Sequence, residues 1–383
     1  MSLCIAGMGW VTPLGSGLDS VWQRMMRGDE AIASKIAGPF ETSKSYSAFR
    51  VPADALTDLP AHPRLRRASA ISRFAVAAGL AALKEARLTI DRDIIDRTAL
   101  VFAVANGGVS YTKRFYHDIV QAGASAASPL LFPETVFNAP ASHLAAVLGL
   151  TGASYTLVAD GAAGILAIRM AEDLMADERF DYCLVVGAEE ADWVLCDAYS
   201  KWRLLRSEPP IEPFHKRPRG TVLSEGAGAI LLARKGVIGI KKVHPGGNFF
   251  RRTAATQWTA KVLSGLDCET ATVIISSANG TFIDEAERTA LSQMRCKACV
   301  YSPKAALGES VGASGIWQII VGAQALLTRQ LPPLLHSSME TGINQTAAGT
   351  RADENIVLDC GMNQQIAGLR LTAKAENSSC VEG

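Results

Sequence analysis

Short apolar runs alternate with amphipathic stretches over roughly the first 235 residues of the chain. Apolar runs bounded by turn residues predict buried strands, and apolar positions three or four residues apart predict helices with one buried face. The alternation therefore predicts a layered α/β fold. The predicted strands are Leu3–Ala6, Ala99–Val104, Ser154–Val158, Tyr182–Val186 and Ala229–Ala233, and the predicted helices are Ser69–Ala86, Ser142–Leu148 and Ala162–Ala176.

The same pattern begins again after residue 235. Two similar lobes are therefore expected, at residues 1–235 and 236–372, followed by a polar, frayed tail at 373–383. The predicted strands of the second lobe are Val237–Val243, Ala271–Ser276, Cys299–Tyr301 and Asn355–Leu358, and its predicted helices are Asp284–Met294 and Gly315–Thr328.

Composition narrows the class of protein. The 38 Lys and Arg residues against 37 Asp and Glu residues leave a net charge of +1, which gives no support to a nucleic-acid binder. No run reaches the roughly 18 apolar residues of a membrane span, and no basic segment precedes the first apolar residues, so we expect a cytoplasmic protein. Cys296 and Cys299 form a CxxC without further ligands nearby, so neither a metal site nor a cofactor is expected.

Two glycine clusters are candidates for nucleotide binding. Gly7-Met8-Gly9 lacks the third glycine and the acidic residue of a dinucleotide site, and is predicted to be a glycine turn after a strand. Ser224–Ala229 lacks the Lys-Ser/Thr of a phosphate-binding loop, so its glycines are expected to permit close backbone packing. Neither cluster predicts a nucleotide ligand.

Six segments, in this order, together resemble the successive signatures of β-ketoacyl-acyl-carrier-protein synthases of the thiolase superfamily. The resemblance covers nearly the whole chain and implies two duplicated βαβαβ halves in five alternating layers of helices and sheets, usually in a dimer. The segments are Gly7–Gly15, Ser128–Asn138, Gly149–Ser154, Val186–Glu189, Pro213–Phe214 with Leu223–Gly228, and Lys304 with Leu307–Gly308 and Gly312–Gly315.

The family's nucleophile is a Cys at the start of a helix, where free N–H groups and the helix dipole favour a thiolate and bind an oxyanion. Matching Gly152 and Gly164 to the flanking glycines of that motif places Gly161 at the nucleophile position. Glycine has no side chain with which to attack a thioester. The resemblance therefore implies a chain without the family's covalent chemistry.

The other catalytic positions differ as well. The family has two histidines that assist decarboxylation, and their matches here are Asn279 and Glu309, whereas Lys304 keeps the family identity. A glycine- and phenylalanine-rich gate near the C-terminus is replaced by Leu358–Gln365, called the gate segment below. A simple interpretation of Asn279 and Glu309 is a polar pair that fills a former cavity, with Glu309 neutralised by Lys304.

This pattern is similar to that of the chain-length factors, the β subunits of type II ketosynthases, although many of these have Gln where this chain has Gly161. The resemblance implies a heterodimer with an active ketosynthase, formed across the strand Ser154–Val158 and served by an acyl carrier protein. Such a subunit shapes the tunnel for polyketide, polyene or fatty-acid-like chains.

Tunnel residues can be proposed from the same resemblance. Thr112, Tyr116 and Ile119 recur at helical spacing on one face, and with Phe137 they are predicted to line the tunnel at the dimer interface. An ordinary core face has the same apolar spacing, so this alternative stays open.

Two other functions also remain open. The chain could be an enzyme with altered chemistry that uses Asp160 or Glu309 as nucleophile or base, or it could be a stand-alone acyl-binding protein. Basic side chains could meet an acidic carrier protein or form an ordinary solvated surface; they are Arg64, Arg66, Arg67, Arg203 and Arg206.

Overall fold

The computed structural model describes residues 3–39, 44–88, 91–337 and 353–374. Its strands are β1 (Cys4–Thr12), β2 (Gly15–Ser16), β3 (Ala33–Ala37), β4 (Ser45–Phe49), β5 (Thr98–Val104), β6 (Ser154–Val158), β7 (Tyr182–Glu189), β8 (Leu223–Ser224), β9 (Gly226–Ala233), β10 (Ile238–Asn248), β11 (Val273–Ile275), β12 (Cys299–Tyr301), β13 (Glu354–Cys360) and β14 (Gln365–Ala373). Its α-helices are α1 (Leu18–Met26), α2 (Ala70–Glu85), α3 (Arg92–Asp96), α4 (Val109–Ala122), α5 (Ala139–Leu148), α6 (Ala163–Met175), α7 (Trp193–Lys201), α8 (Ala255–Gly265), α9 (Phe282–Gln293), α10 (Lys304–Leu307) and α11 (Val311–Thr328).

The main sheet is a duplication. One half has the strand order β1-β9-β7-β5-β6, and the other has the order β10-β14-β13-β11-β12. In each half the outer three strands are parallel and the inner pairings are antiparallel. Antiparallel pairing of β1 with β10 joins the halves, with Cys4 opposite Gly239. The prediction of two duplicated halves is confirmed, whereas the exact limits of the two lobes and the tail remain predictions.

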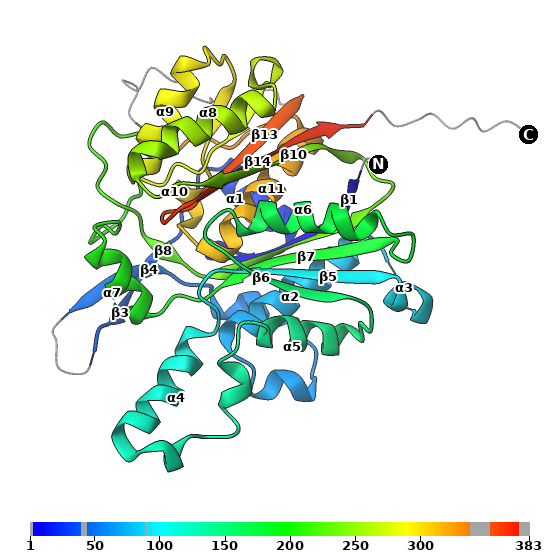
Figure 1. Cartoon of the computed structure of the whole chain (residues 1–383), viewed down its shortest axis with the longest axis vertical. Helices are drawn as coiled ribbons and strands as arrows, with labels where there is room; N and C mark the ends of the chain where they lie inside the picture. The colour runs from blue at the N-terminus through cyan, green and yellow to red at the C-terminus, as the bar shows by residue number, and fades with distance from the viewer. Residues whose placement is uncertain (1–2, 40–43, 89–90, 338–352, 375–383) are drawn as a thin grey trace, which may run out of the picture.

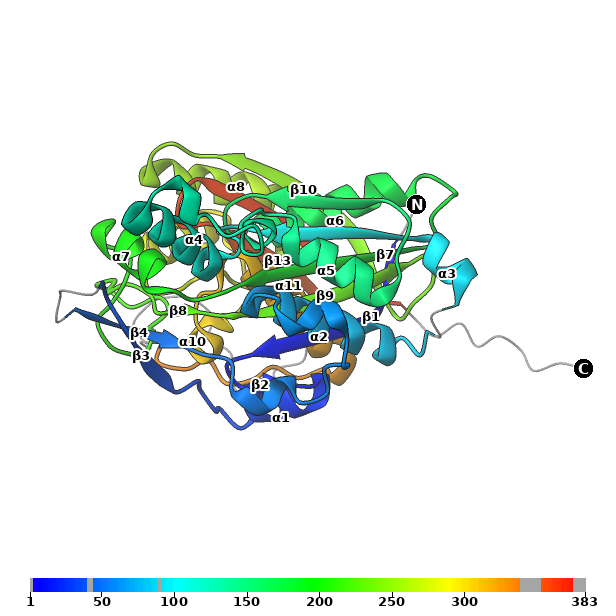
Figure 2. The same ribbon diagram turned by 90° about the horizontal axis from the view of Figure 1, so that it is seen from below.

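The two halves of the sheet lie in separate layers. Figure 1 shows α8 and α9 above β10, β13 and β14, with α6 and α11 between the two halves and α2 and α5 below β5 and β7. Figure 2, seen from below, has α2, α5 and α4 on the near side. The arrangement is the five-layer fold that the resemblance implied.

Helix α11 forms the centre of the molecule. Of the described helices, it is the one long and apolar enough to cross a membrane, but 89% of its residues are buried inside the protein. It packs closely on α6, because a Cβ at Gly164 would lie 2.9 Å from the Ile316 nitrogen and 3.1 Å from the Gly315 Cα. Glycine at these positions lets the helix backbones approach each other.

Some predicted boundaries were wrong. The predicted glycine turn at residues 7–9 is instead part of β1, where any Cβ at Gly7 or Gly9 would overlap the α2 carbonyls of Ala82 and Ala78. The helix predicted from Ser142 begins at Ala139, with a proline in its first turn. Strand β14 was not predicted, and it includes Ala373 from the predicted tail, whereas residues 375–383 lie outside the described part.

Candidate functional site

The predicted nucleophile position lies in the turn between β6 and α6. Gly161 follows the end of β6 at Val158 and precedes the start of α6 at Ala163, so it is close to a helix N-terminus, as predicted. A Cβ at Gly161 would lie 2.8 Å from the Gly361 Cα and 3.2 Å from the Gly361 nitrogen. Real Cβ atoms do not approach main chain this closely, so the backbone of the β13–β14 turn fills the space that a nucleophile would need.

Asp160 holds this turn in place. Its Oδ2 accepts hydrogen bonds from the backbone nitrogens of Asn363 and Gln364, both at 2.9 Å, and its own nitrogen donates to Gln365 Oε1 at 3.0 Å. The Gly361 nitrogen donates to the Gln365 carbonyl at 2.7 Å, which closes the hairpin. The carboxylate considered as an alternative nucleophile is therefore bonded to the gate segment.

The other predicted positions form one buried polar cluster. Glu309 Oε2 accepts hydrogen bonds from Asn279 Nδ2 at 2.6 Å and from Lys304 Nζ at 2.8 Å, while Glu309 Oε1 accepts one from Ser314 Oγ at 2.9 Å. None of the three predicted residues is more than 2% exposed. Both oxygens of the Glu309 carboxylate are thus occupied inside the protein, and it is placed as an ion-pair partner of Lys304.

A second carboxyl group lies beside this cluster. Asp359 is fully buried, its oxygens have no hydrogen-bond partner among the residues that the structure describes, and Lys304 Nζ lies 3.9 Å from its Oδ1. Burial raises the pKa of Asp359 well above its ordinary value. For Lys304, burial alone lowers the pKa, but the charges of Glu309 and Asp359 outweigh it and the pKa rises. Lys304 thus lies between two buried carboxyl groups, at 2.8 Å from Glu309 and 3.9 Å from Asp359.

Loops around the cluster are held by two further buried carboxyl groups. Asp284 accepts hydrogen bonds from the backbone nitrogens of Phe214 at 2.6 Å, Asn279 at 2.8 Å and Gly280 at 3.1 Å. Burial nevertheless raises the pKa of Asp284 to about 7. Glu287 likewise bonds the backbone nitrogen of Ser277 at 3.0 Å and the hydroxyl of that residue. These bonds fix the loop that carries Asn279.

The end of β13 connects the two parts of the site. Asp359 lies beside Lys304, Cys360 donates from its nitrogen to Ser277 Oγ at 3.0 Å, and Gly361 lies against Gly161. Gly161 and Lys304 therefore both lie against the gate segment, and Lys304 connects it to Glu309 and Asn279 through the buried cluster. Every one of them contacts protein atoms, and their arrangement offers no free nucleophile or imidazole.

Two models of one protein family together match most of the chain. The model for the β-ketoacyl synthase N-terminal domain matches residues 2–236, and the model for the C-terminal domain matches residues 244–338. The chain belongs to the β-ketoacyl synthase family.

Curated relatives of this β-ketoacyl synthase family member include nodulation protein E from Rhizobium leguminosarum bv. trifolii, which is 28% identical over 60% of this chain and 57% of the relative. The chain thus spans less than three fifths of the length of that relative. The 3-oxoacyl-[acyl-carrier-protein] synthase 2 of Vibrio cholerae is 23% identical over 87% of both chains.

Solved structures with the same fold include a β-ketoacyl synthase from Burkholderia phymatum STM815, with a TM-score of 0.85 and 19% identity over 98% of this chain and 100% of that one. A ketosynthase in complex with its chain length factor from Xenorhabdus doucetiae has a TM-score of 0.81 and 19% identity over 97% and 98%. At this identity the likeness establishes the fold.

The predicted tunnel residues of this ketosynthase-family chain lie on a projecting arm. We call residues 105–138, which include α4, the α4 arm; Figure 1 shows α4 extending away from the sheets. Thr112, Tyr116 and Ile119 all belong to α4, as predicted, and Tyr116 is 59% exposed. Phe137 is half-exposed and packs over Gly107, whose Cβ would lie 2.9 Å from the Phe137 Cδ1.

The predicted dimer strand is an open edge. β6 pairs with β5 on one side, and no described strand pairs with its other side. Tyr155 and Val158 of this edge are 45% and 48% exposed. An edge with exposed apolar side chains and unpaired backbone groups is typical of a surface that pairs with another chain.

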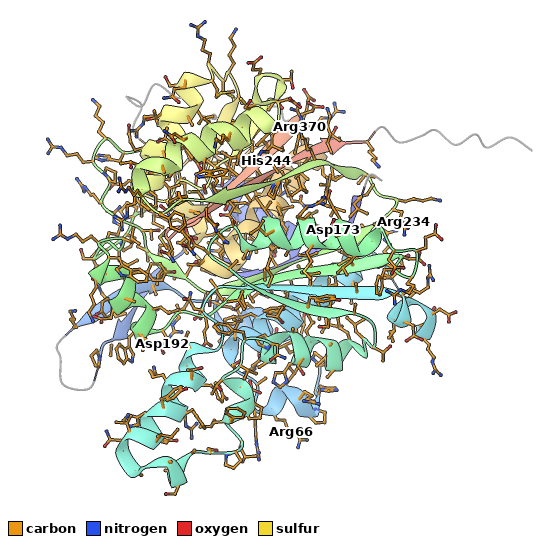
Figure 3. All side chains as sticks on the ribbon, viewed as in Figure 1. Arg66, Asp173, Asp192, Arg234, His244 and Arg370 are labelled. Atoms are coloured by element: carbon orange, nitrogen blue, oxygen red, sulfur yellow. The ribbon has the colours of Figure 1, made fainter. Side chains whose placement is uncertain are left out.

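The basic residues considered for carrier-protein binding differ in their surroundings. Arg64, Arg66 and Arg67 are exposed at a short 3₁₀ turn (Figure 3 labels Arg66), and Arg203 is exposed near the end of α7. Arg206 is mostly buried and pairs with Glu212 at 3.1 Å. Among residues the structure describes, no three His, Cys, Asp or Glu side chains are grouped as metal ligands, and Cys296 donates to the Cys268 carbonyl.

Sequence reasoning missed several buried carboxyl groups. Asp359 enters the sequence-based prediction only as a member of the gate segment, and Glu189 only as a member of a family signature. Glu190 and Asp192, which follow Glu189 and are also buried, received no role. A signal was present in the sequence, because several acidic residues follow closely on a strongly apolar strand. Acidic side chains near a buried strand need hydrogen-bond or charge partners, so they indicate a structural role.

Proposed function

We propose that this chain is a non-catalytic, chain-length-factor-type subunit that pairs with an active β-ketoacyl-acyl-carrier-protein synthase and shapes its acyl tunnel. The observation that carries the proposal is the close approach of Gly361 to Gly161, which leaves no room for any side chain at the predicted nucleophile position. A chain of this family that cannot form the acyl thioester is expected to contribute through its partner.

The surroundings of the two alternative catalytic groups support a non-catalytic role. A nucleophile or general base needs free access to the reacting atoms. Asp160 instead bonds the gate segment, and Glu309 bonds Asn279, Lys304 and Ser314 within a closed cluster. Altered chemistry at either carboxylate would require this cluster or the hairpin to open.

The exposed edge of β6 favours a partnered subunit over a stand-alone acyl-binding protein. A partner would shield the exposed apolar side chains of Tyr155 and Val158 from water, and the free edge of β6 can accept a strand from another chain. Structures with the same fold include the ishigamide ketosynthase/chain length factor, with a TM-score of 0.83 and 19% identity over 98% of this chain and 99% of that one. Another such structure, AntDE:AntF, contains a type II acyl-carrier protein with its ketosynthase.

In the proposed complex the α4 arm meets the partner and forms part of the tunnel wall. Thr112, Tyr116, Ile119 and Phe137 are its lining residues. The reaction served is elongation of a polyketide, polyene or fatty-acid-like chain, with acyl and extender units delivered by a carrier protein. This chain would form part of the tunnel wall, and the partner would supply the nucleophile and the imidazoles.

Intact-mass spectrometry tests the proposal. The chain is incubated with acyl carrier protein loaded with an acyl group, with and without an active ketosynthase from the same organism. The acyl adduct is expected on the ketosynthase alone, and a ketosynthase lacking its Cys should leave both chains unmodified. Gly161→Cys should not form an adduct or restore condensation, since Gly361 blocks the site and both histidines are replaced. A stable adduct on the unmodified chain would overturn the proposal.

A further inference from the structure

The α4 arm lacks the apolar anchor that holds most helices on a protein. None of the α4 side chains is buried, although the helix spans 14 residues, Val109–Ala122. Its N-cap residue is Gly108, which has no side chain to bond the free N–H groups of the first turn. Something outside the helix must therefore fix the direction in which the arm leaves the body.

Three carboxyl groups at the end of β7 and just after it, those of Glu189, Glu190 and Asp192, perform this role at the base of the arm. Glu189 Oε2 accepts hydrogen bonds from the backbone nitrogens of Ala105 at 3.2 Å and Asn106 at 3.1 Å. Glu190 Oε1 accepts one from the Ser110 nitrogen at 2.6 Å. Because Ser110 lies in the first turn of α4, Glu190 acts as the missing cap of the helix from a distant segment.

Asp192 extends the contact by one turn of the helix. Its Oδ2 lies 2.5 Å from Lys113 Nζ, and its Oδ1 accepts a hydrogen bond from the Val194 nitrogen at 3.0 Å, which caps α7. Figure 3 shows Asp192 between α7 and the place where α4 leaves the body. The same short segment thus connects β7, α7 and α4.

The loop with the three carboxyl groups is itself held firmly. Glu225 accepts a hydrogen bond from the Ala191 nitrogen at 3.3 Å and pairs with Arg50 at 2.8 Å. Glu189, Glu190 and Asp192 are all buried. A hydrogen bond to a buried acceptor is costly to leave unmade, because the donor that loses it stays out of contact with water.

The other end of the arm has a similar attachment. Glu134 lies 2.5 Å from His143 Nε2 of α5 and accepts a hydrogen bond from the Ser69 nitrogen at 3.3 Å. These attachments, together with the hydrogen bond that the Tyr111 hydroxyl donates to the Arg67 carbonyl at 2.9 Å, hold a segment whose middle contains exposed apolar side chains such as Val120. The attachment of α4 is therefore mainly polar, and carboxyl groups accept most of its hydrogen bonds.

We infer that Glu190, assisted by Glu189 and Asp192, is a positioning residue that sets the direction of the α4 arm and thereby the depth of the proposed acyl tunnel. The inference about tunnel depth rests on the proposed function, whereas the inference about the arm does not. Glu190 acts through α4 and need not touch an acyl chain.

Hydrogen–deuterium exchange of the chain tests whether Glu190 sets the direction of the α4 arm. Glu190→Leu keeps the approximate volume but removes the acceptor, whereas Glu190→Gln keeps an acceptor oxygen for the Ser110 N–H. Amides of residues 105–122 should exchange at least about tenfold faster in the Leu variant, a change that corresponds to about 1.4 kcal/mol, and at the wild-type rate in the Gln variant. Exchange in β5 and β7 should stay unchanged in both.

Asp91→Leu is the matched control, because Asp91 caps another helix, α3, through the Ile94 nitrogen at 3.0 Å. It should affect exchange at α3 and leave the α4 arm unchanged. Wild-type exchange of the arm in Glu190→Leu would overturn the inference, and so would equally faster exchange throughout the lobe, since that would mark a general structural role.

A second experiment tests whether Glu190 affects the depth of the proposed tunnel. It measures the lengths of the products that the chain makes when it is paired with an active ketosynthase, carrier protein and malonyl donor. Glu190→Leu should give a broader length distribution than wild type, and Glu190→Gln should restore it. An unchanged distribution despite a loosened arm would overturn the role in tunnel depth. If the wild-type pair makes no product, the proposed function fails, while the exchange experiment still decides whether Glu190 positions the arm.

Discussion

β6 and the turn that follows it are adjacent in the sequence, yet one is open to solvent and the other is closed by main chain. Tyr155 and Val158 of β6 are about half-exposed, and one edge of the strand is unpaired. Three residues after the strand, Gly161 meets the backbone of Gly361. Under the proposed function, the open edge of β6 would meet a partner, and the closed turn would leave this chain without a nucleophile.

The closed region should depend strongly on its buried ion pair. Lys304→Ala would leave Glu309 without its cation inside the protein, and breaking such a pair costs about 3–5 kcal/mol in the free energy of unfolding. Urea unfolding followed by circular dichroism measures the loss. Lys201→Ala is the control, because its pair with Asp197 is exposed and worth less than about 1 kcal/mol. Equal, small losses for both variants would show that the cluster does not hold the closed site together.

The carboxyl group of Glu189 should make stability depend on pH. Burial raises its pKa from 4.5 to about 8, so between these values the folded chain binds more protons than the unfolded chain. The free energy of unfolding should therefore fall as pH rises through this window, with a contribution on the order of a few kcal/mol. Glu189→Gln mimics the neutral acid and should lack this contribution.

Thermal or urea unfolding of both proteins from pH 4.5 to 8 measures this effect. Glu189→Gln should match the wild type at the acid end and become progressively more stable than it toward pH 8. A constant difference across the range would mean that Glu189 does not take up a proton on folding.

The contact between Gly161 and Gly361 offers a smaller but more local test. Gly161→Ala adds a Cβ that would lie 2.8 Å from the Gly361 Cα, and forcing main chain apart in a packed interior costs about 1–3 kcal/mol. Unfolding by urea measures the cost, and exchange of the amides in residues 358–365 should increase. Full stability with an unchanged hairpin would show that the space at the turn is larger than the contact implies.

Changes in side-chain size on the proposed tunnel wall should change the length of the products. Thr112→Trp should shorten the products of the reconstituted pair, because added bulk closes tunnel volume, while Tyr116→Ala or Phe137→Ala should allow longer ones. Arg114→Ala, also on α4 but off the predicted face, is the control and should change nothing. If all three distributions match the wild type while the pair still forms, chain length is set elsewhere.

The alternation of strands and helices could be predicted because most core strands are continuous apolar runs, such as β5 and β9, which are buried throughout. β14 was missed because Arg370 interrupts it; this buried side chain bonds the distant carbonyls of Leu266 and Asp267, the Thr270 hydroxyl and the Glu354 carboxylate. Nothing near Arg370 in the sequence indicates those acceptors.

The candidate site was predictable in its residues but not in its contacts. Motif order identified Gly161, Asn279, Lys304 and Glu309 as positions, and the suggestion that Lys304 neutralises Glu309 agrees with the 2.8 Å ion pair. The approach of Gly361 to Gly161 joins segments about 200 residues apart through the hairpin that Asp160 holds. Such a contact follows from tertiary packing, which local patterns do not encode.

Sedimentation velocity of the chain with and without an active ketosynthase tests the central claim, that this protein works as a partner through the open edge of β6. We predict a complex of one chain with one ketosynthase, and an affinity at least about tenfold weaker for Tyr155→Asp, because that charge would be buried in the interface. Glu285→Ala serves as the control, because Glu285 lies on the exposed surface of α9 in the other half of the molecule. A stable monomer that does not associate with the ketosynthase would contradict the account.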